Sequence, residues 1–470
     1  MSDAVDVAVI GAGPAGMAAA CAAAAAGLSV AVLDDQPAPG GQVWRAAEAV
    51  AARGDLDIFG ADYAKGVAAV ARFRAASGGG IDYRPLARAV GVEDREDAAG
   101  GDVLYVREGA ARRLACRSLV IATGAYERPM PFRGWTLPGV MTLGAAQIAM
   151  KTADLLPARP YVLAGQGPLL LLLVAQLRRA GAAPDLILRL DDPARRVASL
   201  AHGPKAAALG PDYLLKGLRW AAALGSAVRN VVDLAAEGDG RLERVAWRTA
   251  DGAAGSVEAA CLLIHDGVLP NAQLTRAMRA PHVHDARAAA WRPEADPATG
   301  RLAGRDWVHV AGDCAGIAGW AAAEAAGALA GAAAATRLGQ AARAPGARLR
   351  LARARAVRPL LDALYPPARA FAAPADDVLV CRCEAQTAGD VRAAARLGAQ
   401  GPNQLKAFTR AGMGPCQGRM CATTVARLLA AAQDRDVADV GLMRVRMPIS
   451  PVTIGEMSAL DDAGLDLPRT

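Results

Sequence analysis

The sequence predicts an α/β protein in which two βαβ units precede a small, mostly helical C-terminal domain. The βαβ units are predicted because an apolar run leads into a glycine-rich loop and then a helix-forming segment at residues 7–26 and again at 161–181. Four cysteines within residues 381–421 set the C-terminal region apart. A chain of 470 residues has room for two to four domains.

The composition is that of a folded, globular chain. Apolar residues make up 53% and charged residues 21% of the sequence. The net charge of +7 is modest and the arginines are scattered, so we expect no nucleic-acid partner. The N-terminus is acidic where a secretory signal would be basic, and the longest strongly apolar run, 169–174, is too short to span a bilayer. These features favour a cytoplasmic protein without a transmembrane segment and leave peripheral membrane association open.

The first unit carries a dinucleotide-binding pattern. Residues 7–10 predict a buried parallel strand, residues 11–16 (GAGPAG) the loop, and the alanines up to about Ala26 a helix that Gly27 ends. In such a loop Gly11 permits the turn, Gly13 lets the backbone approach a pyrophosphate, and Gly16 lets helix and strand pack closely. The free N–H groups at the helix start attract phosphate.

An acidic residue ends the next expected strand, at residues 28–33. Asp34 is expected to accept hydrogen bonds from the ribose hydroxyls of an adenosine, and Asp35 is the alternative. Strand register favours Asp34.

Three further segments favour FAD over NAD. They are Pro39-Gly40-Gly41-Gln42, then Ala122-Thr123-Gly124 at the end of a strand, then Ala311-Gly312-Asp313 before a helix. In this order they resemble the glutathione-reductase-like, two-dinucleotide-binding flavoproteins over about residues 4–345. The resemblance implies an Asp313 carboxylate on a ribityl hydroxyl. The predicted FAD-binding residues are Gly11, Gly13, Pro14, Ala15, Gly16, Asp34, Gly41, Gln42, Thr123, Gly124 and Asp313.

The second unit departs from the pattern. Its loop is Gly165-Gln166-Gly167-Pro168-Leu169-Leu170, in which Leu170 replaces the third glycine. We expect this leucine to push the helix off its strand and to spoil a pyrophosphate site. Arg189, after the strand at 186–188, could suit a 2′-phosphate, so NAD(P) binding and a structural remnant both stay open. The flavin region has no Cys-x-x-Cys pair, which argues against a disulfide-reductase mechanism.

Cys381, Cys383, Cys416 and Cys421 predict a metal centre. A [2Fe–2S] cluster, a zinc ion and free core cysteines are the alternatives. The Cys-x-Cys spacing of the first pair favours the cluster over zinc, and four nearby basic residues would offset its charge: Arg382, Lys406, Arg410 and Arg419. His282 and His284 are expected to be surface histidines in a loop rather than metal ligands. No functional role is expected for His202, His265 and His309 either. No catalytic residue is predicted.

The residues around these cysteines resemble a more specific family. CRCE at 381–384, NQLK at 403–406 and GMGPCQGRMC at 412–421 resemble the C-terminal module of the FAD-carrying subunits of opine oxidases, hydroxyproline dehydrogenases and hydrogen cyanide synthases, which are related to the sarcosine oxidase α subunit. TGAYERP at 123–129 with GWTLPGV at 134–140, the second loop and the tail at 446–456 also match. The resemblance thus implies that the lost glycine is a family trait.

This resemblance implies a domain plan. The FAD-binding domain comprises 1–150 and 285–345, and a second nucleotide-binding-like domain comprises 151–284. A connector at 346–374 leads to a BFD-like [2Fe–2S] domain at 375–435 and to a tail at 436–470 that is a candidate subunit contact.

The resemblance also implies an activity. The chain would be an oxidoreductase subunit that carries FAD and a [2Fe–2S] cluster in a heteromeric dehydrogenase of CH–NH or CH–NH2 donors. An amino-acid-oxidase-like flavoprotein β subunit is the expected partner, and one further small subunit is also a candidate. The alternative is a self-sufficient NAD(P)H-dependent flavin reductase that feeds its own cluster.

Overall fold

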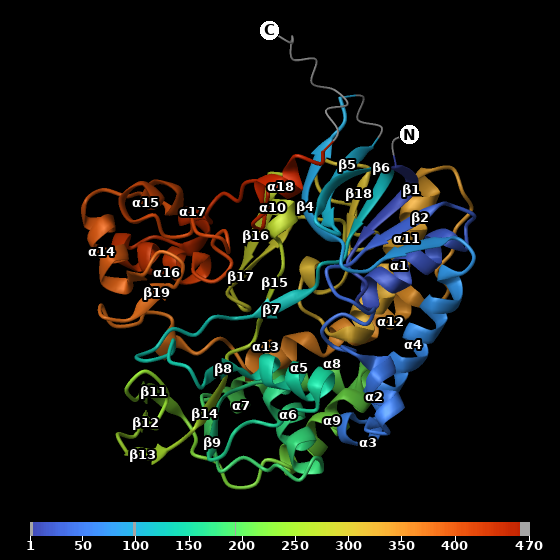
Figure 1. Cartoon of the computed structure of the whole chain (residues 1–470). Coiled ribbons are helices and arrows are strands. Elements are labelled where there is room, and N and C mark those ends of the chain that lie inside the picture. Colours follow the sequence, from blue (N-terminus) through green and yellow to red (C-terminus); the bar gives the residue numbers. More distant parts are fainter. Residues whose placement is uncertain (1–2, 97–99, 193, 461–470) are drawn as a thin grey trace.

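A seven-stranded sheet forms the N-terminal domain in the computed structural model, which describes residues 3–96, 100–192 and 194–460 (Figure 1). The order is β3-β2-β1-β6-β5-β4, and β18 pairs with the last part of β6. Its strands are β1 (Asp3–Ile10), β2 (Val30–Leu33), β3 (Ile81–Arg84), β4 (Arg88–Asp94), β5 (Gly101–Arg107), β6 (Ala110–Ile121) and β18 (Val308–Val310). The fold class predicted from the sequence is confirmed.

The two faces of this sheet bury different side chains because successive residues of a strand alternate. Val7 and Val9 face one core, together with α1 and α4, whereas Ala8 and Ile10 face the other. The helices of this domain are α1 (Pro14–Ala24), α2 (Ala47–Arg53), α3 (Leu56–Phe59), α4 (Ala61–Ser77) and α11 (Trp320–Arg337).

Residues 81–121 contribute both parallel and antiparallel strands to this sheet. β4, β5 and β6 do pair antiparallel. The stretch Ile81–Arg84, however, extends the parallel sheet beside β2. β3 is therefore the parallel strand at one edge of the sheet.

A second, parallel sheet has the order β10-β9-β14-β8 and lies below the first in Figure 1. Its strands are β8 (Val140–Thr142), β9 (Tyr161–Gly165), β10 (Leu186–Arg189) and β14 (Cys261–His265). Around it lie α5 (Leu143–Ala153), α6 (Pro168–Arg179), α7 (Ala194–Ser199), α8 (Gly203–Leu209), α9 (Pro211–Ala222) and an antiparallel sheet of β11 (Val231–Glu237), β12 (Arg244–Thr249) and β13 (Ala254–Glu258).

Two small ribbons and one short helix join the two sheets. The ribbons pair β7 (Ala125–Glu127) with β15 (Val268–Pro270) and β16 (His282–Asp285) with β17 (Ala290–Pro293), and the helix is α10 (Gln273–Ala277).

The C-terminal cysteine domain lies to the left in Figure 1, reached through α12 (Ala347–Ala356) and α13 (Arg358–Leu364). It contains β19 (Leu379–Cys381), β20 (Gln386–Thr387), α14 (Ala388–Arg396), α15 (Pro402–Thr409), α16 (Ala422–Gln433) and α17 (Val437–Val440). The chain then returns to the first sheet, where Ile449 N donates to Val90 O on β4 at 2.9 Å, and α18 (Ile454–Met457) follows. Tail residues 461–470 lie outside the described residues. No helix in the described part of the chain is long and apolar enough to cross a bilayer.

Candidate functional site

The first glycine loop lies in a tight backbone cradle. A Cβ at Gly16 would lie 1.7 Å from Gly11 O, and a Cβ at Gly11, where φ is +101°, would lie 2.5 Å from Ala122 O. Helix α1 begins at Pro14 with no side-chain cap at Gly13. Its first N–H groups, including that of Ala15, are thus left for an anion.

The Gly40–Gly41 turn closes on this loop. Gly40 N donates to Ala12 O at 2.8 Å, and a Cβ at Gly41 would lie 2.8 Å from the Cα of Gly13. The structure therefore brings two segments together that sequence reasoning had linked only by their order.

Asp34 is the acidic residue that points inward. It is 6% exposed; Oδ1 accepts from Gln36 N at 3.2 Å, while Oδ2 is buried with no partner among the described residues. Burial, and secondarily the neighbouring Asp35, raises the pKa of Asp34 to about 7. Asp35 is exposed and accepts from its neighbour Gln36. An orphaned, buried carboxylate oxygen requires a donor, and the ribose hydroxyls of a dinucleotide supply one, so the residues fit FAD.

Asp313 lies near the same loop because α11 packs directly on α1. A Cβ at Gly327 would lie 1.9 Å from Ala15 O, so only a glycine permits this approach. The Asp313 Oδ1 accepts from Ala318 N at 2.9 Å and Gly319 N at 3.2 Å, which orders the start of α11. The other carboxylate oxygen of Asp313, Oδ2, accepts no hydrogen bond from the described residues. Burial raises the pKa of Asp313.

Thr123 and Gly124 hold a neighbouring loop. The Thr123 hydroxyl donates to Asn271 O at 2.8 Å, and Asn271 N donates to Gly124 O at 2.9 Å. The Thr123 hydroxyl thus binds protein, and its predicted contact with the cofactor stays a prediction, as do the other assignments to FAD.

A buried lysine missed by sequence reasoning supports the Gln42 turn. Lys151 Nζ donates to the carbonyls of Gln42 and Val43, at 3.2 and 3.0 Å, and to Gln147 Oε1 at 3.0 Å. Burial lowers the pKa of Lys151 to about 7. The scarcity of lysine in the chain was the only sequence signal for it, and the Gln42 side chain itself is exposed.

A buried leucine takes the third glycine position of the second loop, while the space beside Gly167 is open. Leu170 is 1% exposed and packs in one core with Leu163 and Leu173, in the position where Gly16 leaves no room in the first unit. Arg189 does not face an open phosphate site, because its guanidinium binds both oxygens of Asp191, at 2.5 and 2.7 Å.

The connector crosses the same loop. Gln166 Nε2 donates to Asp266 Oδ1 and to Pro366 O, both at 2.7 Å, and Ala368 N donates to Asp266 Oδ1 at 3.0 Å. These contacts lie at the carboxyl ends of β9 and β14, where an open α/β sheet usually takes its ligand. The connector thus contacts the second glycine loop at this end of the sheet.

The four cysteine thiols gather in two pairs. Cys381 shares a hydrogen bond with Cys421, and Cys383 with Cys416. The bond from Cys421, followed by backbone N–H groups, lowers the pKa of Cys381 to about 6, and the same pairing raises the pKa of Cys421. All four are free thiols.

Glycines let the two cysteine loops meet. A Cβ at Gly414 would lie 2.3 Å from the Cβ of Cys383, and Gly412 has φ +85°. Among the described residues, no group of three or more His, Cys, Asp or Glu side chains is close enough to hold one metal ion. The donor set of four thiols fits a [2Fe–2S] cluster, which takes two thiolates on each iron.

The basic residues expected around the cysteines are only partly free. Arg410 Nε lies 3.0 Å from Glu384, Arg382 lies over the Trp135 ring at 5.5 Å, and Lys406 donates to Arg444 O at 2.9 Å. Arg419 has a buried Nε without a partner among the described residues.

The short helix α10 lies between the loop of Thr123 and Gly124, called here the flavin loop, and the cysteine domain. Gln273, the first residue of α10, donates through Nε2 to Cys416 O at 3.4 Å and Gln417 O at 3.2 Å. Asn271, two residues before Gln273, is hydrogen-bonded to Thr123 and Gly124. Gln273 is 2% exposed, and the phenol of Tyr126 lies close enough to Cys416 and Arg419 to sense their charge.

The histidine expectations were wrong in part. His282 and His284 lie in strand β16 rather than a loop, and both are half-buried. His265 is buried with Nδ1 2.7 Å from Glu127 Oε1, whose other oxygen accepts from Gly144 N at the start of α5. His309 is also buried. Long-range pairing, which a single sequence does not reveal, buried these rings.

The comparisons with known proteins agree with this geometry. Residues 5–327 match the pyridine nucleotide-disulphide oxidoreductase family, and residues 379–461 match the sarcosine oxidase A3 domain. The chain is 43% identical to the A subunit of opine oxidase from Agrobacterium tumefaciens, over 98% of this chain and 92% of that protein. The chain belongs to the pyridine nucleotide-disulphide oxidoreductase family, together with the opine oxidase A subunits. It is accordingly an oxidoreductase and a flavoprotein.

Another relative and a solved structure are less similar to this chain in sequence. Hydrogen cyanide synthase subunit HcnB of Pseudomonas aeruginosa is 33% identical over 94% of this chain and 96% of its own length. Among solved structures, L-proline dehydrogenase from P. horikoshii superposes with a TM-score of 0.70 at 21% identity, over 96% of this chain and 79% of that one. This likeness shows that the fold extends through the cysteine domain.

Proposed function

We propose that this chain is the electron-transfer subunit of a heteromeric amine or imino-acid dehydrogenase of the opine, hydroxyproline or glycine type, and that it carries FAD and a [2Fe–2S] cluster. The observation that carries the proposal is the contact of Gln273 with the backbone of Cys416 and Gln417, which joins the flavin loop to the cysteines. FAD accepts one or two electrons and an iron–sulfur centre passes one at a time.

The chain's own residues would hold each group. The start of α1 and the cradle of Gly13 and Gly41 would take the pyrophosphate, and Asp34 the ribose. Cys381 and Cys421 would bind one iron, and Cys383 and Cys416 the other. Cys381 and Cys421 are buried, whereas Cys383 is exposed and Cys416 is half-buried. The iron held by Cys383 and Cys416 would therefore lie nearer to solvent.

A partner is supported by the names of the relatives, which are subunits of opine oxidase, hydrogen cyanide synthase and sarcosine oxidase. Among the residues of this chain we assign no acid or base to substrate oxidation. An amino-acid-oxidase-like flavoprotein β subunit would therefore oxidise the amine, and this chain would accept the electrons. We further propose a cytoplasmic location.

Iron and sulfide analysis tests the cluster. Anaerobically purified protein should contain about two irons and two sulfides per chain. Cys383→Ser, at the exposed thiol, should lose the cluster while keeping FAD, and Cys21→Ser, outside the cysteine domain, should lose neither. Zinc in place of iron would contradict the proposal.

Mixing with NADH or NADPH tests the electron source. Because Leu170 takes the third glycine position, Arg189 is paired with Asp191 and the connector contacts the second loop, neither nucleotide should bleach the flavin absorbance. Rapid bleaching would instead support a self-sufficient NAD(P)H-dependent reductase. Co-purification from the native host should bring a second flavoprotein subunit with this chain.

A further inference from the structure

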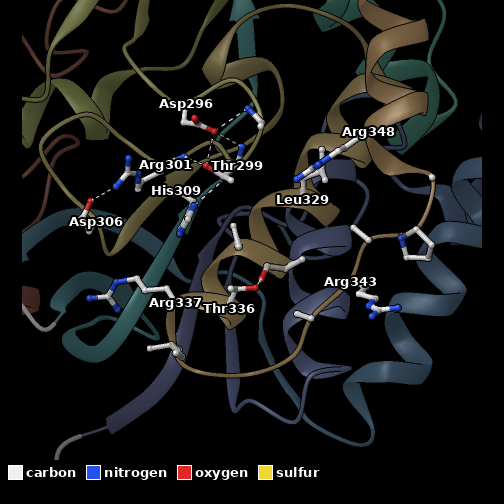
Figure 2. A pocket seen from close by; sticks show the side chains of 18 of the residues that line it. Asp296, Thr299, Arg301, Asp306, His309, Leu329, Thr336, Arg337, Arg343 and Arg348 are labelled. Atoms are coloured by element: carbon white, nitrogen blue, oxygen red, sulfur yellow. Dashed lines mark hydrogen bonds and ion pairs between the residues drawn. The ribbon is translucent and has the colours of Figure 1, made fainter.

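A hollow of about 1290 Å³ lies between β18, α11 and the segment leading into α12, away from both proposed cofactor sites (Figure 2). Arg117 lines it, next to Ser118, which pairs with Val7 early in the parallel part of the sheet. The phosphate loop follows Ile10 at the other end of that strand. Arg117 thus lies toward the opposite end of the parallel strands from the FAD loop, whereas His309, which pairs with Val120, lies nearer to that loop.

A buried histidine forms its floor. His309 is 3% exposed, and its Nδ1 lies 3.1 Å from Thr299 O. Since a carbonyl only accepts, Nδ1 carries the hydrogen and Nε2 presents a lone pair. Nε2 is buried with no partner among the described residues, and the ring projects into the hollow in Figure 2. An unpaired buried polar atom is costly, so this nitrogen calls for a ligand.

The rim has an excess of positive charge. Arg301 pairs with Asp306 at 2.7 Å, and the Asp296 carboxylate accepts from its own turn. Arg343 and Arg348, by contrast, make no ion pair within the described structure. Arg337 donates only to a backbone carbonyl, that of Arg117 at 2.8 Å. Within the residues that the structure describes, these three guanidinium groups therefore have no carboxylate partner.

A helix end adds to this charge. The ten-residue helix α12 begins at Ala347 behind Gly346, which offers no side-chain cap, and its first turn has no acidic residue. Gly346 and Arg348 both line the hollow. Ala347 N donates to Ala344 O at 3.1 Å, and the N–H groups of Arg348 and Leu349, with the helix dipole, favour an anion there.

We propose that this hollow binds a phosphomonoester of metabolite size. One phosphate oxygen would share a proton with His309 Nε2, and the others would accept from the guanidinium groups of Arg337, Arg343 and Arg348 or from the start of α12. The proton can sit on a hydrogen phosphate that donates to neutral histidine, or on a histidine that donates to the dianion. Leu329, Ala332 and Ala333 would contact the carbon part of the ligand.

Calorimetric titration of the holoprotein with glucose 6-phosphate and with inorganic phosphate, at constant ionic strength, tests the site. Both probes should bind saturably to one site per chain. Arg343→Ala with Arg348→Ala should weaken that binding at least tenfold. Arg244→Ala with Arg248→Ala, two exposed arginines of β12, is the matched control and should leave it unchanged. Absence of saturable binding, or an equal loss in both double variants, would overturn the site.

Sulfate tests the role of His309, because sulfate stays a dianion between pH 6 and 8 and has no O–H to donate. It can use Nε2 only when the histidine is protonated. Burial, then Arg337 and Arg301 against Asp296, lowers the pKa of the free ring, and a bound dianion would raise it. Sulfate affinity should therefore rise from pH 8 to pH 6, by at most tenfold per pH unit for one proton. His309→Gln should abolish this rise; a pH-independent affinity in the unaltered protein would exclude His309 as a ligand.

Discussion

At the scale of single residues, a buried polar atom without a partner is the clearest mark of a missing ligand. Asp34 Oδ2 and His309 Nε2 are both of this kind. Asp34 directly follows strand β2, and His309 lies in strand β18; an apolar side chain at either position would leave no unpaired buried polar atom. The cost of burying each group is therefore offset by something the chain itself does not supply.

Asp34 makes FAD affinity depend on pH. In the free protein its pKa is raised to about 7 by burial, so the carboxyl is mostly protonated at pH 6. Ribose hydroxyls that donate to the carboxylate favour its charged form, so binding releases a proton and affinity should rise with pH up to about 7 and then level off. Flavin fluorescence titrations between pH 5.5 and 8.5 would measure this.

The matched variant is Asp34→Asn, which keeps the shape and cannot ionise. Its affinity should be lower, by about 2 kcal/mol for a lost charge-assisted hydrogen bond, and nearly flat across that pH range. Asp35→Asn, at the exposed neighbour, should keep most of the affinity. A steep pH profile in Asp34→Asn would assign the titration to another group.

At the scale of elements, the two βαβ units differ in how closely helix and strand approach. Gly16→Leu introduces into the first loop the residue type that the second loop has at Leu170. Because even a Cβ there would lie 1.7 Å from Gly11 O, α1 must shift, and the protein should lose FAD binding by more than tenfold. FAD content after purification measures this; Gly217→Leu, where α9 has open space, should stay yellow.

The reverse change should not create a nicotinamide site. Leu170→Ala removes a fully buried side chain and should lower the free energy of unfolding by about 2–5 kcal/mol. It should bind no NADH, because Arg189 stays paired with Asp191 and Gln166 stays bound to Pro366 O. Denaturant unfolding and NADH fluorescence are the two measurements. NADH binding by this variant would show that the leucine alone closes the loop.

The same comparison explains what the sequence could predict. Strand, glycine turn and helix follow one another within about twenty residues, so the period of apolar side chains and the glycine spacing reveal them. The direction of β3 and the burial of His265 and His309 depend on segments far away in the chain. The lysine at 151 and Pro366 act on loops more than 100 residues distant, and no local pattern marks them.

At the scale of the whole molecule, the cysteine domain is fixed to the flavin domain by a few polar contacts. Trp135 Nε1 donates to Leu379 O at 2.7 Å, Arg276 donates to Met443 O, and Gln273 holds the Cys416 loop. Of these, only the Gln273 contact reaches the backbone of a cysteine. It should therefore influence electron transfer more than it influences folding.

Gln273→Met tests this, because methionine is of similar length and donates no hydrogen bond. Losing the donor to two carbonyls should weaken docking by about 1–3 kcal/mol. Iron and FAD contents should stay near the normal values, while reduction of the cluster by the photoreduced flavin, followed by freeze-quench EPR, should slow severalfold. The control is Gln400→Met, an exposed position in the cysteine domain whose side chain makes no hydrogen bond among the described residues. An unchanged rate in Gln273→Met would mean that electrons leave the flavin by another route, whereas loss of iron would make the glutamine a part of the cluster's scaffold.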